Sequence, residues 1–209
     1  GEKDTIMTPK DSIIYYKHFL QTGMMAMEPR TGHIKAWVGG VNYKYFQYDH
    51  VGQGARQVGS TFKPFVYATV IEQLQMSPCD SIIDSYFTMP KGKWGIDADW
   101  SPKNSDGNYR GTITLQKALA NSVNTVSAKL IDKVGPQAVV DMAKELGVTS
   151  DIPVQPSIAL GAVDITVEQM VGAMSTYDNQ GVYVKPTFII KIEDKNGVVI
   201  DQPKKKKKD

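Results

Sequence analysis

The sequence has few of the residue types that build disulfides, metal centres and cofactor sites. Its single cysteine, Cys79, excludes an intramolecular disulfide and any cysteine-based metal cluster. The three histidines, at positions 18, 33 and 50, lack the short spacing typical of a histidine metal site. We therefore predict neither a metal nor another cofactor.

Long apolar runs and a strong excess of one charge are also missing. No stretch is long and apolar enough to span a membrane, and no signal-peptide pattern begins at Gly1. Lys and Arg number 24 against 22 Asp and Glu, and five of the lysines form one run at 204–208. Without this run the chain would be slightly acidic, so we predict no nucleic-acid partner and interpret the run as a solvated tail. The 209 residues suit one domain or one large fragment of a domain.

Hydrophobic periodicity and turn residues predict a mixed α and β chain. The predicted helices cover residues 8–20, 60–76, 125–134, 138–146 and 166–179, with a further helix that opens at 112–115. The predicted strands cover residues 24–27, 34–38, 183–192 and 198–200, and the last two are joined by a hairpin turn at Asn196 and Gly197. Residues 77–110 are rich in Pro, Gly, Asp and Asn and predict a long irregular loop of a functional or mobile kind.

The segment from Gly59 to Pro64 carries the first candidate for chemistry. Ser60 and Lys63 stand three residues apart at the predicted start of a helix, so they share one face. A serine hydroxyl becomes a good nucleophile when a neighbouring base takes its proton, and a lysine is such a base when burial or a helix dipole lowers its pKa. An isolated Ser-x-x-Lys is equally typical of a helix cap with a solvated lysine behind it.

Ser122 and Asn124 form the second candidate pair. On a helix, residues two apart point to nearly opposite sides, whereas in extended backbone they point to the same side. Both side chains therefore reach one site only if they lie in a turn between two helices, and the boundary signals on either side favour such a turn. In isolation, the pair is also explained as two helix caps.

These two segments and much of the chain around them resemble the transpeptidase domain of class A (bifunctional) penicillin-binding proteins. In this chain, residues 56–67 (RQVGSTFKPFVY) resemble the family's nucleophile segment, with Val58 where the family usually has proline. Residues 100–104 (WSPKN) and 109–125 (YRGTITLQKALANSVNT) resemble the segment that leads into the family's second motif. Residues 25–40 (MAMEPRTGHIKAWVGG) resemble the strand pair that opens the family's domain. Residues 158–186 (IALGAVDITVEQMVGAMSTYDNQGVYVKP) resemble its later helix and strand.

The resemblance implies a role for each candidate residue. Ser60 would attack the carbonyl of a D-Ala-D-Ala stem peptide, and Lys63 would be the general base. Ser122 would relay a proton to the leaving amine, and Asn124 would bind the substrate amide and place Lys63. A β-lactam would acylate the same Ser60. The implied fold is α+β, with an antiparallel sheet flanked by helices.

One family motif is missing from this chain. The Lys-Thr-Gly strand that follows the later strands in the family is absent, and Arg30-Thr31-Gly32 resembles it only in letters because it precedes the nucleophile. Either the parent protein continues with this motif or it lacks the motif altogether. We expect the former, and therefore a fragment with an incomplete sheet. It would consist of a linker and first helix at 1–20, a truncated transpeptidase domain at 21–203, and a lysine-rich tail at 204–209.

The resemblance also implies a setting and partners. The partners would be peptidoglycan stem peptides and β-lactam antibiotics. The parent protein would carry a glycosyltransferase domain and an N-terminal membrane anchor, with the transpeptidase on the periplasmic side of the bacterial cytoplasmic membrane.

Four other interpretations stay open. The first is an inactive fragment, and the second is a β-lactamase. The third is a non-catalytic β-lactam sensor or scaffold of the same fold. The fourth is a sugar- or peptide-binding module that uses the tyrosine-rich residues 42–50. A β-lactamase needs a carboxylate that activates water, and residues 157–181 resemble the penicillin-binding helix instead.

Overall fold

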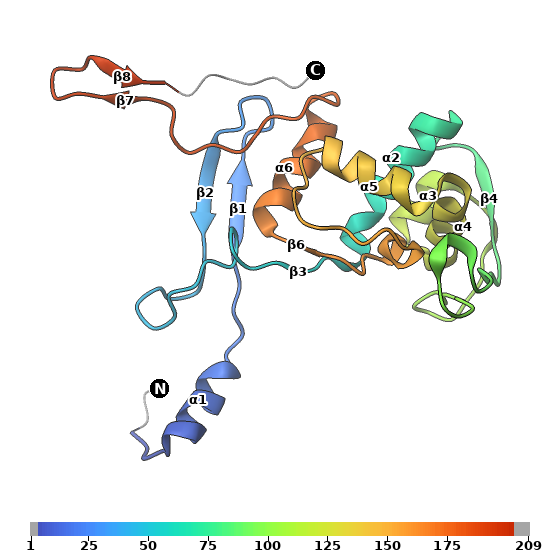
Figure 1. Cartoon of the computed structure of the whole chain (residues 1–209), viewed down its shortest axis with the longest axis horizontal. Coiled ribbons are helices and arrows are strands. Elements are labelled where there is room, and N and C mark those ends of the chain that lie inside the picture. The colour runs from blue at the N-terminus through green and yellow to red at the C-terminus, as the bar shows by residue number, and fades with distance from the viewer. Residues whose placement is uncertain (1–3, 203–209) are drawn as a thin grey trace.

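The computed structural model describes residues 4–202. It shows a body of helices flanked by a β-hairpin, from which a first helix and a last hairpin project in different directions (Figure 1). The predicted lysine-rich tail lies outside the described residues, and the division of the chain at residues 20 and 203 stays a prediction.

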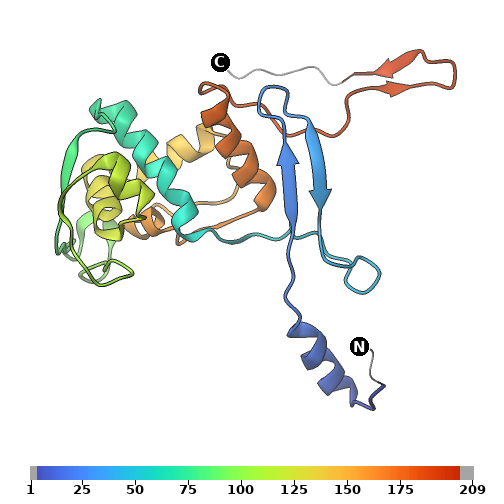
Figure 2. The ribbon, with the colours of Figure 1, turned by 180° about the vertical axis from the view of Figure 1, so that it is seen from behind.

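The helical body is built around one buried helix, α2 (Lys63–Leu74), which a short 3₁₀ helix, η1 (Gly59–Phe62), precedes. Both views place α2 through the body (Figures 1 and 2). It packs against α3 (Leu115–Ala120), α4 (Asn124–Val134), α5 (Pro136–Glu145) and the 3₁₀ helix η3 (Pro156–Leu160).

The core contains the apolar faces of these helices. Its fully buried side chains include Phe62, Phe65, Val66, Val70, Val126, Leu130 and Ile131. Burial of each such side chain stabilises the fold by about 1.5–3 kcal/mol relative to its exposure. The apolar spacing that predicts a buried helix after Ser60 is thus confirmed.

Local capping residues set several of the helix boundaries. The Oγ1 atoms of Thr8, Thr114 and Thr166 accept backbone N–H groups of the first turns of α1 (Pro9–Lys17), α3 and α6 (Val167–Asp178), respectively. Such a bond satisfies a donor that has no partner within its helix. The starts predicted for α1 and α6 are confirmed to within one residue, whereas α3 begins three residues later than predicted.

The strands form antiparallel pairs, each with one neighbour. They are β1 (Met24–Met27) with β2 (Ile34–Val38), β3 (Arg56–Gln57) with β6 (Asp164–Ile165), β4 (Ser81–Asp84) with β5 (Gly111–Thr114), and β7 (Ile192–Glu193) with β8 (Val199–Asp201). Helix α6 packs on β1. The α+β class and the antiparallel pairing are confirmed, although within residues 4–202 the strands form four separate pairs instead of one sheet.

Three details of the prediction are wrong. The irregular stretch 77–110 contains the strand β4 and a short 3₁₀ helix, η2 (Lys93–Gly95), and residues 112–114 are strand instead of helix. Of the strand predicted at 183–192, the structure keeps Ile192 in β7 and a bridge from Thr187 to His33.

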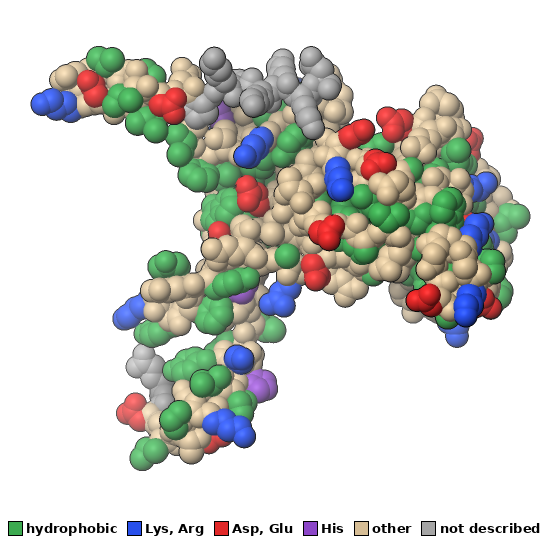
Figure 3. Space-filling view, viewed as in Figure 1, with side chains coloured by type: hydrophobic (Ala, Val, Ile, Leu, Met, Phe, Trp, Pro, Cys, Tyr) green, Lys and Arg blue, Asp and Glu red, His purple; other side chains and the backbone are tan. Residues whose placement is uncertain are grey.

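The projecting segments expose apolar side chains. None of the residues of α1 is buried, although the sequence predicts one apolar face for this helix. Phe188, Ile189, Ile190 and Ile192 are also exposed. Figure 3 shows hydrophobic side chains on the surface of both the α1 and the β7–β8 projections.

Candidate active site

Ser60 lies on the exposed surface of η1, immediately before the central helix. The backbone before it is held to the loop after η3, because Gly59 N donates to Gly161 O at 3.1 Å and Val58 N donates to Val163 O at 3.0 Å. A side chain at Gly161 would overlap the carbonyl group of Gly59, and the φ of Gly161 is +77°. The position of Ser60 therefore depends on glycine at 161.

Lys63 is the first residue of α2, and its side chain is fully buried. Its Nζ donates to Ser122 O at 2.7 Å, to Ser122 Oγ at 2.8 Å and to Asn124 Oδ1 at 2.7 Å. Burial lowers the pKa of Lys63 to about 8, because the charged form loses its hydration. A lysine with this pKa is partly neutral near pH 8, as a general base must be.

Ser122 lies in the turn between α3 and α4 and has a left-handed backbone, with φ of +52°. This conformation closes the end of α3, since Ser122 N donates to Leu119 O and Val123 N donates to Ala118 O, both at 2.9 Å. A left-handed non-glycine residue costs roughly 1–2 kcal/mol. The conformation turns both the carbonyl oxygen and the hydroxyl of Ser122 toward Lys63.

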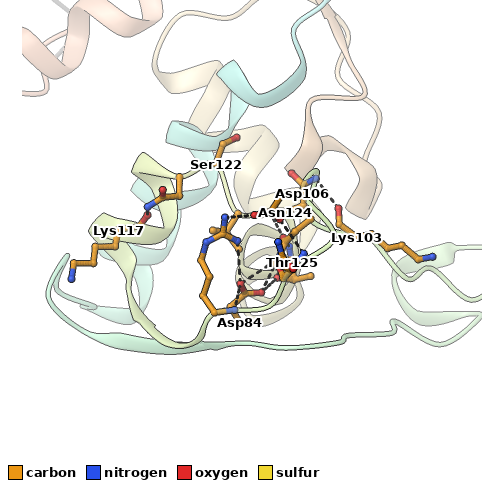
Figure 4. A network of polar contacts seen from close by, with 12 residues as sticks. Asp84, Lys103, Asp106, Lys117, Ser122, Asn124 and Thr125 are labelled. Atoms are coloured by element: carbon orange, nitrogen blue, oxygen red, sulfur yellow. Dashed lines mark hydrogen bonds and ion pairs between the residues drawn. The ribbon is translucent and has the colours of Figure 1, made fainter.

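Asn124 begins α4, and its side chain bridges two segments. Its Oδ1 accepts from Lys63, and its Nδ2 donates to Lys103 O at 2.9 Å. Its backbone N–H donates to Asn104 Oδ1 at 3.0 Å (Figure 4). The amide is therefore held from both ends.

A buried polar cluster, which the sequence reasoning does not identify, lies beneath this site. Its buried members are Asp84, Asn104 and Thr125, and the exposed Arg110 joins it from the surface. Burial acts to raise the pKa of Asp84, but hydrogen bonds from Thr125, Asn104 and Arg110 outweigh it and hold the pKa below its ordinary value. The available sequence signal is the segment WSPKN at 100–104, which ends in Asn104.

The structure thus brings together Lys63, Ser122 and Asn124 by direct hydrogen bonds. Ser60 lies one turn before Lys63, whose backbone N–H donates to Ser60 O. Within residues 4–202 the Ser60 hydroxyl makes no hydrogen bond, so its contact with Lys63 stays a prediction. The catalytic roles of all four residues likewise stay predictions.

Neither a metal site nor a membrane span is found in the described part of the chain. Residues 4–202 contain no cluster of three or more His, Cys, Asp and Glu side chains that could hold a metal ion. No helix in this part is both long enough and apolar enough to cross a bilayer.

Comparison with known proteins finds one family over most of the chain. The model of the penicillin binding protein transpeptidase domain matches residues 22–209. Penicillin-binding protein 1A of Aquifex aeolicus (strain VF5) is 37% identical over 185 residues, which cover 88% of this chain and 25% of that protein. The protein of the same name from Neisseria lactamica is 36% identical over 85% of this chain and 22% of that protein. The chain therefore spans about a quarter of the length of these relatives.

Solved structures agree with this match. A crystal structure of penicillin-binding protein 1A from Haemophilus influenzae superposes with a TM-score of 0.82 and 28% identity, over 90% of this chain and 28% of that one. The structure of PonA1 from Mycobacterium tuberculosis in complex with penicillin V gives a TM-score of 0.74 and 27% identity, over 92% of this chain and 54% of that one.

Proposed function

The chain belongs to the penicillin-binding protein transpeptidase family, and we propose that it contributes the acyl-transfer centre of a peptidoglycan DD-transpeptidase. The observation that carries the proposal is the buried Lys63 amine, held by Ser122 and Asn124 one helical turn after the exposed Ser60. A base of lowered pKa beside an accessible hydroxyl is the arrangement that nucleophilic catalysis needs.

In the proposed reaction, the Ser60 oxygen attacks the carbonyl carbon between the two D-alanines of a stem peptide. Neutral Lys63 takes the hydroxyl proton, either directly or through Ser122. The C–N bond then breaks, and the departing amine of the terminal D-alanine receives a proton through Ser122. The donor peptide remains attached to Ser60 as an ester.

In the second half of the reaction, an amine from a neighbouring peptidoglycan strand attacks this ester. A new C–N bond forms, the bond to the Ser60 oxygen breaks, and the proton released by the amine returns the serine to its hydroxyl form. Asn124 would hydrogen-bond the substrate amide, and the backbone N–H of Ser60, at a helix N-terminus, would stabilise the oxyanion. A β-lactam would acylate Ser60 by ring opening, without a leaving group that departs.

The setting of the reaction follows from the proposal. The partners are peptidoglycan stem peptides and β-lactams. In the parent protein the domain is joined to a glycosyltransferase domain and to an N-terminal anchor, on the periplasmic face of the cytoplasmic membrane. The domain boundaries at residues 21 and 203 belong to the same proposal.

The test is the intact-protein mass after incubation with benzylpenicillin, on this chain and on a version extended beyond Asp209. We expect one adduct that is lost in Ser60→Ala and kept in Thr61→Ala, a matched change of the neighbouring exposed hydroxyl on η1. Adduct on the extended form alone would make the shorter chain an inactive piece of an active enzyme. No adduct on either form would overturn the proposal.

A second measurement separates an enzyme from a sensor of the same fold. We expect release of D-alanine from a stem-peptide mimic, with loss in Ser60→Ala. Acylation by benzylpenicillin without any D-alanine release would favour the non-catalytic sensor.

A further inference from the structure

The buried carboxylate of Asp84 is surrounded by donors from three segments. Its side chain, at the end of β4, has no exposed surface. It accepts from Thr125 Oγ1 at 2.5 Å, from Asn104 Nδ2 at 2.9 Å and from the Arg110 backbone N–H at 2.9 Å. The Arg110 guanidinium lies 3.5 Å away. A buried charge is tolerated only where it is paired and hydrogen-bonded in this way.

This arrangement determines which way the Asn104 amide points. Its Nδ2 donates to Asp84 and, at 2.8 Å, to Asn108 O. Because the amide nitrogen faces the carboxylate, Oδ1 faces the start of α4. There it accepts the backbone N–H groups of Asn124 at 3.0 Å and Thr125 at 3.2 Å.

Asn104 therefore caps α4 from a distant part of the chain. The residue at the usual capping position, Val123, has no side chain able to cap and makes no such bond. The first N–H groups of a helix have no partner within it and need one from elsewhere. Asn104 supplies that partner for the turn that carries Asn124, whose side chain holds Lys63. Figure 4 shows Asp84 and Thr125 close below Asn124 within one network.

We propose that Asp84 and Asn104 are positioning residues for the acyl transfer. Asp84 orients the Asn104 amide, and Asn104 holds the first turn of α4. Asn124 and Ser122 then keep the Lys63 amine buried and hydrogen-bonded to three acceptors. Neither residue touches substrate. The inference rests on the proposed function for its catalytic consequence, whereas the effect on Lys63 is measurable without any reaction.

The test exchanges the two side chains. Asp84→Asn removes the charge that orients Asn104, and Asn104→Asp places two carboxylates together. The double variant Asp84→Asn/Asn104→Asp restores a donor facing an acceptor, and it sets a carboxylate against the N–H groups of α4, where a negative charge is favourable. Asp141→Asn is the matched control, because this exposed carboxylate on α5 accepts from Gln137 and contacts no member of the Asp84 cluster.

Two readouts are followed in each variant against pH. One is the rate of acylation by a fluorescent penicillin on the extended chain. The other is the NMR titration of Lys63 in protein labelled with ¹³C at the lysine Cε, which leaves the amine unmodified and needs no acylation. We expect each single variant to lose tenfold or more in acylation rate and to shift the Lys63 midpoint upward, because water reaches a loosened site. We expect the double variant to recover most of both, and Asp141→Asn to match the wild type.

A purely structural role would lower the melting temperature and leave the Lys63 midpoint unchanged in the molecules that stay folded. That outcome would overturn the inference, as would a double variant no better than the worse single variant. If the single variants do not fold, Thr125→Val replaces them, because it removes one donor to Asp84. The same slower acylation and upward shift of the Lys63 midpoint are expected. If the wild type is not acylated, the proposed function fails, and the Lys63 titration alone still decides the positioning role.

Discussion

The Nζ atom of Lys63 lies 2.8 Å from the Oγ atom of Ser122, a residue 59 positions later in the chain. The serine that stands only three positions before Lys63 is exposed, and its hydroxyl makes no hydrogen bond within residues 4–202. The hydroxyl in direct contact with the amine is thus the predicted relay and not the predicted nucleophile. This makes Ser122 the first residue to test.

We expect Ser122→Ala to lose at least about 10²-fold in the acylation rate, the usual contribution of a positioned acid or base. Ser122→Gly also removes the hydroxyl, but it relieves the left-handed strain at this position. The glycine variant should therefore be more stable than the alanine variant by about 1 kcal/mol in urea unfolding, and equally slow. Full activity in the glycine variant would show that backbone shape, not the hydroxyl, is what matters.

The pH dependence of acylation should follow the Lys63 amine. Burial lowers its pKa to about 8, and no acidic side chain within residues 4–202 forms an ion pair with it. Because the neutral amine is the base, the acylation rate should rise with pH and level off above an inflection near 8. Stopped-flow acylation from pH 6 to 10 measures this profile. A rate that is flat over this range would rule out Lys63 as the titrating base.

Gly161→Ala should displace the nucleophile segment, because the added Cβ would overlap the carbonyl of Gly59. Gly197→Ala is the matched control: its φ is +82°, but nothing lies within 4 Å of the added atom. The control should show only the backbone penalty of roughly 1–2 kcal/mol. We expect Gly161→Ala to be less stable than the control in chemical denaturation and to be acylated more slowly. Equal behaviour would mean that the contact with Gly59 is easily relieved.

Stability in acid should depend on Asp84. Its pKa is lower in the folded protein than in the unfolded chain, so its stabilisation is present above the ordinary aspartate value of about 3.9 and is lost as the pH falls through the folded value. Asp84→Asn should therefore show a smaller loss of unfolding free energy between pH 6 and 2 than the wild type. Asp141→Asn, at an exposed position outside the Asp84 cluster, is expected to change this difference less.

The exposed apolar residues before β7 should promote association. Phe188 is 74% exposed and Ile190 is 54% exposed, beside strands that have one partner each. Unpaired strand edges and contiguous apolar surface favour self-association. We expect the mass from light scattering to rise with concentration and Ile190→Asp to reduce the rise. An exposed apolar residue elsewhere, Val154, gives the control Val154→Asp, which should leave association unchanged.

Local signals predict the helices well because their causes lie within a few residues. The cap at Thr166 and the glycine at 135 are readable in the sequence and delimit α6 and α4. The pairing of β4 with β5 is not readable, since it joins residues 81–84 to residues 111–114 across a polar loop. The strand predicted at 183–192 is wrong over most of its length. Apart from Ile192, which lies in β7, only Thr187 in this range pairs with another segment, through its bridge to His33.

In the site, too, features set by nearby residues are predictable, and contacts between distant segments are not. Ser122 and Asn124 are predictable from the turn that separates two helices, and both contact Lys63. Asp84 is not predictable, because its partners Asn104 and Thr125 are 20 and 41 residues away in sequence. A capping residue supplied from another segment leaves no signal next to the helix it caps.

The three acceptors around Lys63 have a consequence for the order of proton movements. A lysine ammonium has three N–H bonds, and the carbonyl of Ser122, its hydroxyl and the amide oxygen of Asn124 use all of them. Once the proton leaves, the amine has two N–H bonds and a lone pair, so all three contacts persist only when one of them reverses its direction. The two carbonyl-type oxygens can only accept, whereas the hydroxyl can also donate. With the three contacts kept, neutralising Lys63 makes the Ser122 hydroxyl the donor and the amine the acceptor, which is the direction that the relay through Ser122 requires.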